Sequence, residues 1–301
     1  MSKINYLFKK FSPVHTAVIW EANQIIEDYA AQGYELTLRQ LYYQFISRES
    51  FPDSWRDKVT GSKNNERSYK KLGNIISDAR LAGLIDWEAI TDRTRQLKSW
   101  SLYDNLPDFL RTMKWRFAYN VWKDQPVYIE VWVEKEALAQ VIEKACRHLY
   151  VPHCSCKGYM SQSAMWRSAV RFQNRKEEGK EGHLIYLGDH DPSGMDMSRD
   201  IGDRQDLFLS GVTTHRIALN WDQVEQYAPP PNPTKVTDSR AQGYIDEYGL
   251  DCWELDALEP SVLDLLIQDK ISSLIDPQLM AQAQAHGQYL EEELDRIIKE
   301  I

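Results

Sequence analysis

Two aspartates stand one residue apart, directly after an apolar run, in the segment LIYLGDHDPSG (residues 184–194). They are Asp189 and Asp191, and Glu134 follows a second apolar run, VYIEVWV. Carboxylates held close together repel each other, and a cation usually offsets that cost. Hard oxygen ligands suit Mg²⁺, which keeps several waters and is completed by substrate phosphates. The three acids therefore predict a magnesium site. The alternative is that the aspartates only cap a helix at the end of a loop.

The elements that must position these acids alternate between strands and helices from residue 126 onward. Strands are expected at 126–133, 151–156, 183–188 and 214–219, with helices between them. This alternation predicts an α/β fold with a mainly parallel sheet flanked by helices. In such sheets functional groups gather beyond the carboxyl ends of the strands. The acids stand at two of these ends.

The first third of the chain has the apolar spacing of helices. Helices are expected at 13–31, 37–48 and about 66–82, followed by two short strands around a turn at 84–95. This order is typical of a winged helix, whose third helix commonly enters the major groove of DNA. The candidate DNA contacts are the basic residues of that helix, Arg67, Lys70, Lys71 and Arg80.

The charge of the chain is unevenly distributed. The net charge of −9 by itself argues against a nucleic-acid binder. Residues 1–125, however, carry 19 Lys and Arg against 15 Asp and Glu, and the remainder carries 17 against 30. A positive front and an acidic back are typical of a polyanion-binding module joined to a carboxylate-rich one. Ordinary surface variation is the alternative.

Three further features bear on where the protein works. No apolar run approaches the ~18 residues of a membrane span. The first residues, MSKINYLFKKFSP, lack the apolar core of a secretory signal. The four cysteines do not make a disulfide framework in a chain of 301 residues. We therefore expect a cytoplasmic protein with no membrane partner.

Four segments, in order, resemble the Toprim domain of the topoisomerase VI A subunit, whose family includes the meiotic double-strand-break transesterase. They are VWVEKEAL, GYMSQSAMWRSAVRF, LGDHDPSGMDM and CWELDALEPSVL. The resemblance covers roughly residues 34–270 and is strongest in the Toprim half. It implies that Glu134, Asp189 and Asp191 are Mg²⁺ ligands and that double-stranded DNA is the substrate. The chain has no Gly-rich nucleotide loop. The resemblance therefore implies one of three things: a separate ATPase subunit as a partner, cleavage without strand passage, or a reduced form of the kind found on mobile elements.

The family carries its catalytic tyrosine in a segment of the form Arg-x-x-aromatic-Tyr, and LRQLYYQF matches this form. Tyr42 shares the apolar stripe of Leu38 and Leu41, so we expect it in the core. Tyr43 lies about 100° away around the helix, on the side of Arg39. Tyr43 is therefore the candidate nucleophile. A nearby guanidinium from Arg39 favours the phenolate and stabilises charge on the phosphorane. The alternative is that Tyr43 packs against the next domain.

In relatives the tyrosine of one protomer works with the metal site of the other, so the resemblance implies a homodimer. The expected domains are a winged-helix domain (1–100), a connecting helix (101–125), a Toprim domain (126–260) and a helical tail (261–301). The expected function is Mg²⁺-dependent DNA cleavage that leaves 5′-phosphotyrosyl ends. The alternatives are a Toprim nuclease that activates water and a non-catalytic DNA-binding protein. A zinc site at Cys154 and Cys156 has little support, because the spacing fits no common finger.

Overall fold

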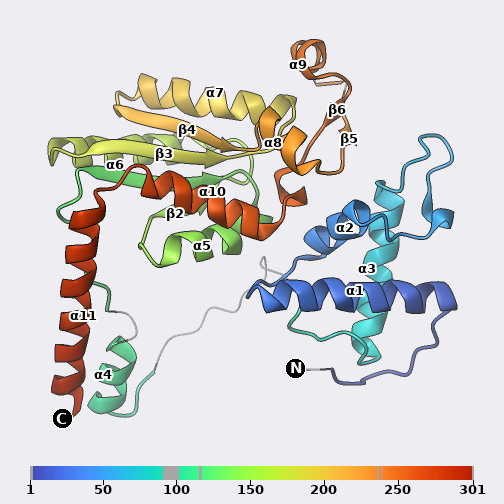
Figure 1. The fold of residues 1–301 in the computed structure, drawn as a ribbon, viewed down its shortest axis with the longest axis horizontal. Helices are drawn as coiled ribbons and strands as arrows, with labels where there is room; N and C mark the ends of the chain where they lie inside the picture. The colour runs from blue at the N-terminus through green and yellow to red at the C-terminus, as the bar shows by residue number, and fades with distance from the viewer. Residues whose placement is uncertain (1–2, 91–101, 115–116, 236, 239, 300–301) are drawn as a thin grey trace.

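The computed structural model describes residues 3–90, 102–114, 117–235, 237–238 and 240–299. The chain forms a helical domain near its N-terminus and an α/β domain, and the carboxyl ends of the strands face the helical domain (Figure 1). None of the helices in these ranges has the length and apolar character needed to cross a membrane. The α/β class expected from the sequence is confirmed.

Capping side chains set the helices of the N-terminal domain. These are α1 (Pro13–Ala31), α2 (Leu38–Ser47) and α3 (Glu66–Leu81), with a 3₁₀ turn at Asp53–Trp55 between the last two. Ser12, Thr37 and Asn65 each accept a hydrogen bond from a backbone N–H in the first turn of the helix that follows. Those N–H groups have no partner inside the helix, so the caps fix where each helix begins. The three expected helices are confirmed.

The wing expected at 84–95 is not formed in the part that the structure describes. Residues 84–90 adopt turns, with an isolated bridge between Leu36 and Ile90, and 91–95 lie outside the described residues. The Arg80 guanidinium donates hydrogen bonds to the backbone carbonyls of Trp87 and Ile90. A side chain thus occupies carbonyls that a hairpin would use. The winged-helix assignment stays a prediction.

Within the described residues, the main sheet contains four parallel strands in the order β2-β1-β3-β4. They are β1 (Val127–Val133), β2 (His153–Ser155), β3 (Glu181–Leu187) and β4 (Val212–Ala218). Along β1 nearly every side chain is buried, because helices cover both faces of the sheet. The register pairs Val133 at the end of β1 with Leu187 at the end of β3. Glu134 and the DHD segment therefore leave the sheet side by side.

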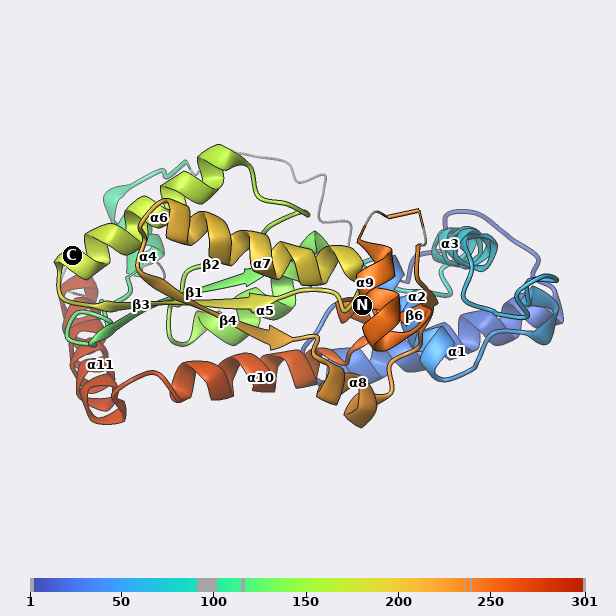
Figure 2. The same ribbon diagram turned by 90° about the horizontal axis from the view of Figure 1, so that it is seen from above.

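The helices divide between the two faces of the sheet (Figure 2). One face carries α5 (Ala139–Arg147), which follows a 3₁₀ turn at Glu136–Leu138, and α10 (Pro260–Ser272); the other carries α6 (Gln162–Glu177) and α7 (Pro192–Leu207). The chain leaves β1 toward β2 across one face, and it leaves β3 toward β4 across the other. The direction of winding thus reverses between β1 and β3. Such a reversal opens a crevice at the carboxyl ends of the two strands.

Short elements complete the rim of this crevice. They are α8 (Trp221–Tyr227), β5 (Asn232–Pro233), α9 (Ala241–Tyr248), β6 (Asp251–Cys252) and a 3₁₀ turn at Leu255–Ala257. β5 and β6 pair antiparallel. β5 lies in the proline-rich segment that follows α8.

The remaining helices, α4 (Leu106–Lys114) and α11 (Pro277–Lys299), lie together away from the N-terminal domain (Figure 1). The connecting helix predicted at 101–125 is shorter than expected in the described part of the chain, because residues 117–126 form no helix. Trp122 lies in this stretch, and its indole donates to the carbonyl of Leu149. Packing against the α/β domain has overridden the local helical pattern.

Candidate active site

An open pocket of about 840 Å³ lies between the N-terminal domain and the carboxyl edge of the sheet. Its lining includes, from the N-terminal domain, Arg39, Tyr42, Tyr43 and Tyr69, and, from the α/β domain, Glu134, Lys135, Asp189, Asp191 and Glu254. The candidate nucleophile and all three candidate metal ligands therefore face one pocket in a single chain.

Glu134 is held against the DHD segment by a direct hydrogen bond. Its Oε2 accepts from the backbone N–H of Asp189 at 2.9 Å. Burial raises the pKa of the Glu134 carboxyl, and the nearby charge of Asp191 adds to this effect. The N–H of Asp189 and the ammonium of Lys135 oppose it. The two strand ends thus place acids close enough to influence each other's charge.

Asp189 has both of its carboxylate oxygens engaged within the protein. Oδ1 accepts from the N–H of Leu255 at 2.8 Å, and Oδ2 lies 2.9 Å from Nζ of Lys135. Burial raises the pKa of Asp189 to about 8, and the charges of Glu134 and Asp256 add to this rise while Lys135 opposes it. The sequence analysis did not predict that the Lys135 ammonium would bind the Asp189 carboxylate.

Asp191 is the N-cap of α7. Its Oδ1 accepts from the N–H of Gly194 at 2.6 Å and from the hydroxyl of Ser193 at 2.9 Å. A Cβ at position 194 would lie 2.3 Å from the carbonyl oxygen of Asp189, so only glycine fits this tight turn. The helix-cap interpretation is therefore correct for Oδ1 of Asp191. Oδ2 accepts no hydrogen bond from Ser193 or Gly194.

The magnesium site expected at Glu134, Asp189 and Asp191 stays a prediction. In the described part of the chain, no group of three or more His, Cys, Asp or Glu side chains is arranged to hold a metal ion. Glu134 Oε1 and Asp191 Oδ2 are nevertheless not hydrogen bonded to any described residue. Mg²⁺ is commonly held by one or two carboxylates, with waters and substrate phosphates completing the shell. Glu134 and Asp191 can supply that pair.

Lys135, the residue after Glu134, carries a mostly buried ammonium, with 18% of its side chain exposed. Nζ lies 2.9 Å from Asp189 Oδ2, 2.6 Å from Glu254 Oε2 and 2.9 Å from Asp256 Oδ1. Burial alone would lower the pKa of this lysine, but the three carboxylates hold it well above its ordinary value. Lys135 therefore stays charged. Its place next to Glu134 in VEKE, and the Glu-x-Asp spacing in WELDAL, were the sequence signals for this cluster.

Arg216 on β4 supports the DHD segment from behind. Its guanidinium donates to the carbonyl oxygens of Asp189 at 2.6 Å and Gly188 at 3.1 Å, and to the Ser198 hydroxyl at 2.6 Å. The charged residue in the predicted strand THRIAL is the feature of the sequence that could have indicated this role. This guanidinium fixes the backbone that carries the acids and adds positive charge beneath them.

Tyr43 lies where periodicity predicted, on the side of α2 that carries Arg39. Arg39 Nη2 donates to the Tyr43 hydroxyl at 3.4 Å, and the Arg39 guanidinium lies 5.7 Å from the ring centroid. The Tyr43 side chain is nonetheless buried. Burial raises the pKa of the phenol, Glu254 and Asp256 add to the rise, and Arg39 opposes it. The expectation that Arg39 favours the phenolate is thus correct in direction but outweighed in this conformation.

Tyr42 is distinguished from Tyr43 by its hydrogen bonds. Its hydroxyl accepts from the N–H of Asn65 at 2.8 Å and lies 3.0 Å from Asn64 Oδ1. Both partners belong to the turn that starts α3. Tyr42 is therefore a structural residue, although its ring also borders the pocket.

Arg39 connects the two domains through acids that the sequence analysis did not single out. Its guanidinium contacts Glu254, and Nε lies 3.3 Å from Asp256 Oδ2. Burial would raise the pKa of Glu254, but Lys135 and Arg39 lower it to about 2. Arg39 is thus bound to carboxylates rather than free to meet a phosphate.

The candidate DNA contacts on α3 differ in their surroundings. Arg67 is exposed, Lys70 pairs with Glu66 at 2.7 Å, and Lys71 lies over the ring of Trp55. Arg80 instead bonds the backbone carbonyls of the turn after α3. Its geometry indicates a structural role.

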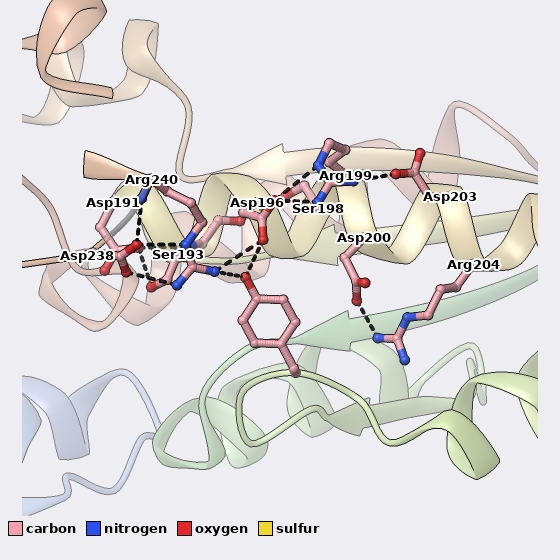
Figure 3. A network of polar contacts seen from close by, with 12 residues as sticks. Asp191, Ser193, Asp196, Ser198, Arg199, Asp200, Asp203, Arg204, Asp238 and Arg240 are labelled. Atoms are coloured by element: carbon pink, nitrogen blue, oxygen red, sulfur yellow. Dashed lines mark hydrogen bonds and ion pairs between the residues drawn. The ribbon is translucent and has the colours of Figure 1, made fainter. Parts of the chain in front are cut away.

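A network of charges ties the loop before α9 to α7 beside the pocket (Figure 3). Arg240 Nε lies 2.8 Å from Asp238 Oδ1, and Arg240 Nη1 lies 3.1 Å from Asp196 Oδ2. The hydroxyl of Tyr159 donates to Asp196 at 2.5 Å, and this bond, with those from Arg199 and Arg240, lowers the pKa of Asp196 to about 2. The loop is thereby held against the helix that begins at Asp191.

The four cysteines form no disulfide bonds. All four are free thiols, and Cys154 and Cys156 belong to no metal-holding group among the residues that the structure describes.

Comparisons with models of protein families, with curated proteins and with solved structures give no match.

Proposed function

We propose that the protein cleaves DNA by transesterification, with Tyr43 as the nucleophile and a single Mg²⁺ held by Glu134 and Asp191. The observation that carries this proposal is the shared pocket: Tyr43 and Arg39 on α2 face the same cavity as the acids beyond β1 and β3. A phenol beside a guanidinium, opposite paired carboxylates, is the equipment that phosphoryl transfer to an oxygen nucleophile needs.

In the proposed step the Tyr43 oxygen forms a bond to a backbone phosphorus while the bond from phosphorus to the 3′ oxygen breaks. The electron pair of the broken bond goes to the 3′ oxygen, which takes a proton from water, and the phenolic proton leaves to solvent. The 5′-phosphotyrosyl end keeps the bond energy for resealing. A bound Mg²⁺ supplies charge stabilisation at the scissile phosphate and the leaving oxygen.

Arg39 must change partners for this step. It now neutralises Glu254 and Asp256. An entering phosphate competes with these carboxylates for the guanidinium, because Arg binds both groups in the same bidentate way. Transfer of Arg39 to the phosphate weakens its hold on the α/β domain and exposes the Tyr43 hydroxyl. The described conformation is then the resting state of the site.

The arrangement supports catalysis within one chain. The resemblance implied that the tyrosine of one protomer serves the metal site of the other, whereas here Tyr43 faces the acids of its own chain. A homodimer and a separate ATPase subunit remain proposals that rest on the resemblance alone.

A second candidate function is a nuclease that uses the metal to activate water. The burial of Tyr43 and its raised pKa favour it, because a protonated, inaccessible phenol is a poor nucleophile. In that case the acids act as proposed and Tyr43 contributes only to packing.

Denaturant trapping after incubation with duplex DNA and Mg²⁺ separates the two functions. Transesterification leaves protein bound covalently to DNA 5′ ends, and chelation of Mg²⁺ prevents this product. Tyr43→Phe should abolish the adduct, while Tyr42→Phe, the matched control, should retain it. Full cleavage by Tyr43→Phe would establish the nuclease instead.

Mixing two inactive variants distinguishes catalysis within a chain from catalysis between chains. Tyr43→Phe and Glu134→Gln proteins are each expected to form no adduct, and the mixture should also form none. Adduct in the mixture would show that the tyrosine and the acids come from different subunits.

A further inference from the structure

Lys135 has the surroundings of a bound metal ion rather than those of an ordinary surface lysine. Its Nζ has contacts of 2.6–2.9 Å with oxygens of three different carboxylates, those of Asp189, Glu254 and Asp256. An ammonium has three N–H donors, so these contacts use all of them. The carboxylates themselves are anchored: Asp189 by the N–H of Leu255, and Asp256 by complete burial of its side chain.

Carboxylates outnumber cations around the pocket. The carboxylates are Glu134, Asp189, Asp191, Glu254 and Asp256, and Glu66 and Asp238 also line the pocket. The cations are Arg39, Lys135 and Arg216, and Lys235 also lines the pocket. A divalent ion would offset part of the excess negative charge. Glu134 Oε1 and Asp191 Oδ2 lack hydrogen-bond partners among the described residues, and so does Asp256 Oδ2, which lies 3.3 Å from Arg39 Nε.

We propose that the Lys135 ammonium is a built-in second cation, held by Asp189, Glu254 and Asp256, so that the site binds one divalent metal ion where a two-metal site would bind two. This inference rests on the proposed function. Two-metal sites for phosphoryl transfer stabilise both the attacking and the leaving oxygen. Here the Lys135 ammonium takes the place of one of the two metal ions. Because its donors are all used by carboxylates, Lys135 acts through its charge and is a positioning residue.

Counting bound ions tests the inference without any reaction. Mn²⁺ serves as the probe, and electron paramagnetic resonance measures the free ion as it is titrated into metal-free protein. The wild-type chain is expected to bind one Mn²⁺. Lys135→Met, which keeps the length of the side chain and removes the charge, should bind two, because three carboxylates lose their cation. Lys135→Arg should bind one, and so should the exposed control Lys157→Met.

The outcomes separate this inference from the proposed function. Two ions on the wild-type chain, or one on Lys135→Met, overturn the role of Lys135 and leave the covalent-adduct assay to decide the function. No ion on the wild-type chain overturns the role of Lys135 and the metal assignment together. If Lys135→Met fails to fold, the wild-type and Lys135→Arg counts still decide. In the adduct assay, the rate of adduct formation by Lys135→Met should be lower by about 100-fold at low Mg²⁺. This rate should recover in part at high Mg²⁺.

Discussion

Arg39 Nε lies 3.3 Å from Oδ2 of Asp256, an oxygen that is fully buried and accepts no hydrogen bond in the described structure. This contact joins α2 of the N-terminal domain to the 3₁₀ turn after β6. It places the guanidinium expected to bind a phosphate on the acidic side of the pocket. The domain junction and the candidate active site therefore share a residue.

Replacement of Arg39 tests that junction. Arg39→Ala leaves Lys135 as the one cation that contacts both Asp256 and Glu254 among the described residues. The free energy of unfolding should therefore fall by about 1–2 kcal/mol. This is the lower part of the range for an unmatched buried acceptor, because the Arg39 side chain is half exposed. Urea unfolding measures the change. Arg147→Ala removes an exposed pair with Glu143 and should change stability by less than about 0.5 kcal/mol. Equal effects of the two variants would mean that the domains are not joined through Arg39.

Tyr42 and Tyr43 should differ in what their hydroxyls contribute to stability. Tyr42→Phe removes the acceptor of the Asn65 N–H and should lower the free energy of unfolding by about 1–3 kcal/mol. Tyr43→Phe removes a 3.4 Å contact with Arg39 and a contact with the Glu254 carboxylate, and should change the free energy of unfolding by less than about 1 kcal/mol. Thermal unfolding of the two variants measures the difference. A larger loss for Tyr43→Phe would place its hydroxyl in the structural framework.

The basic residues of α3 should separate into DNA contacts and a structural residue. Arg67→Ala or Lys71→Ala should each weaken duplex binding for all sequences and reduce the slope of log affinity against log salt by about 1. Arg80→Ala should instead lower stability, since its guanidinium holds two backbone carbonyls. Fluorescence anisotropy at several salt concentrations measures the slopes. A salt slope unchanged in both Arg67→Ala and Lys71→Ala would place the DNA elsewhere.

Two adjacent histidines should make stability depend on pH. His183 Nδ1 lies 3.1 Å from His215 Nε2 on the neighbouring strand. Burial lowers the pKa of both, Lys270 of α10 lowers them further, and Glu181 opposes this at His183. Unfolding restores the ordinary value near 6.5. The unfolded chain then binds more protons, so this contribution is complete above about pH 6.5 and is lost as the pH falls below it.

Urea unfolding at pH 7.5 and pH 5.5 checks this dependence. His215→Gln should reduce the difference in unfolding free energy between the two pH values, whereas His15→Gln, on the exposed face of α1, serves as the control. If His215→Gln leaves the difference unchanged, the pair is not its source.

The sequence predicted the elements whose pattern is local. The helices α1, α2 and α3 have apolar periodicity and capping residues, and β1 and β3 are continuous apolar runs. The predicted connecting helix was wrong in length, because Trp122 is drawn into contact with Leu149 on the α/β domain. No local pattern contains that contact.

The candidate site was predictable as far as residue types at strand ends. Asp189 and Glu134 follow from the parallel sheet, and Tyr43 follows from its position on α2. Lys135 was not singled out, because its role depends on Glu254 and Asp256, which lie about 120 residues away and reach it only through the fold. Pairings of this kind are set by tertiary packing, so the residue types in VEKE and WELDAL do not by themselves show that the side chains meet.

His190 and Trp253 exchange both backbone hydrogen bonds, each at 2.9 Å. These bonds connect the loop that carries Asp189 and Asp191 to the segment that carries Glu254 and Asp256. We therefore expect the four carboxylates to move as one unit. A movement of the N-terminal domain would therefore change the distance from Tyr43 to the carboxylates of both segments together.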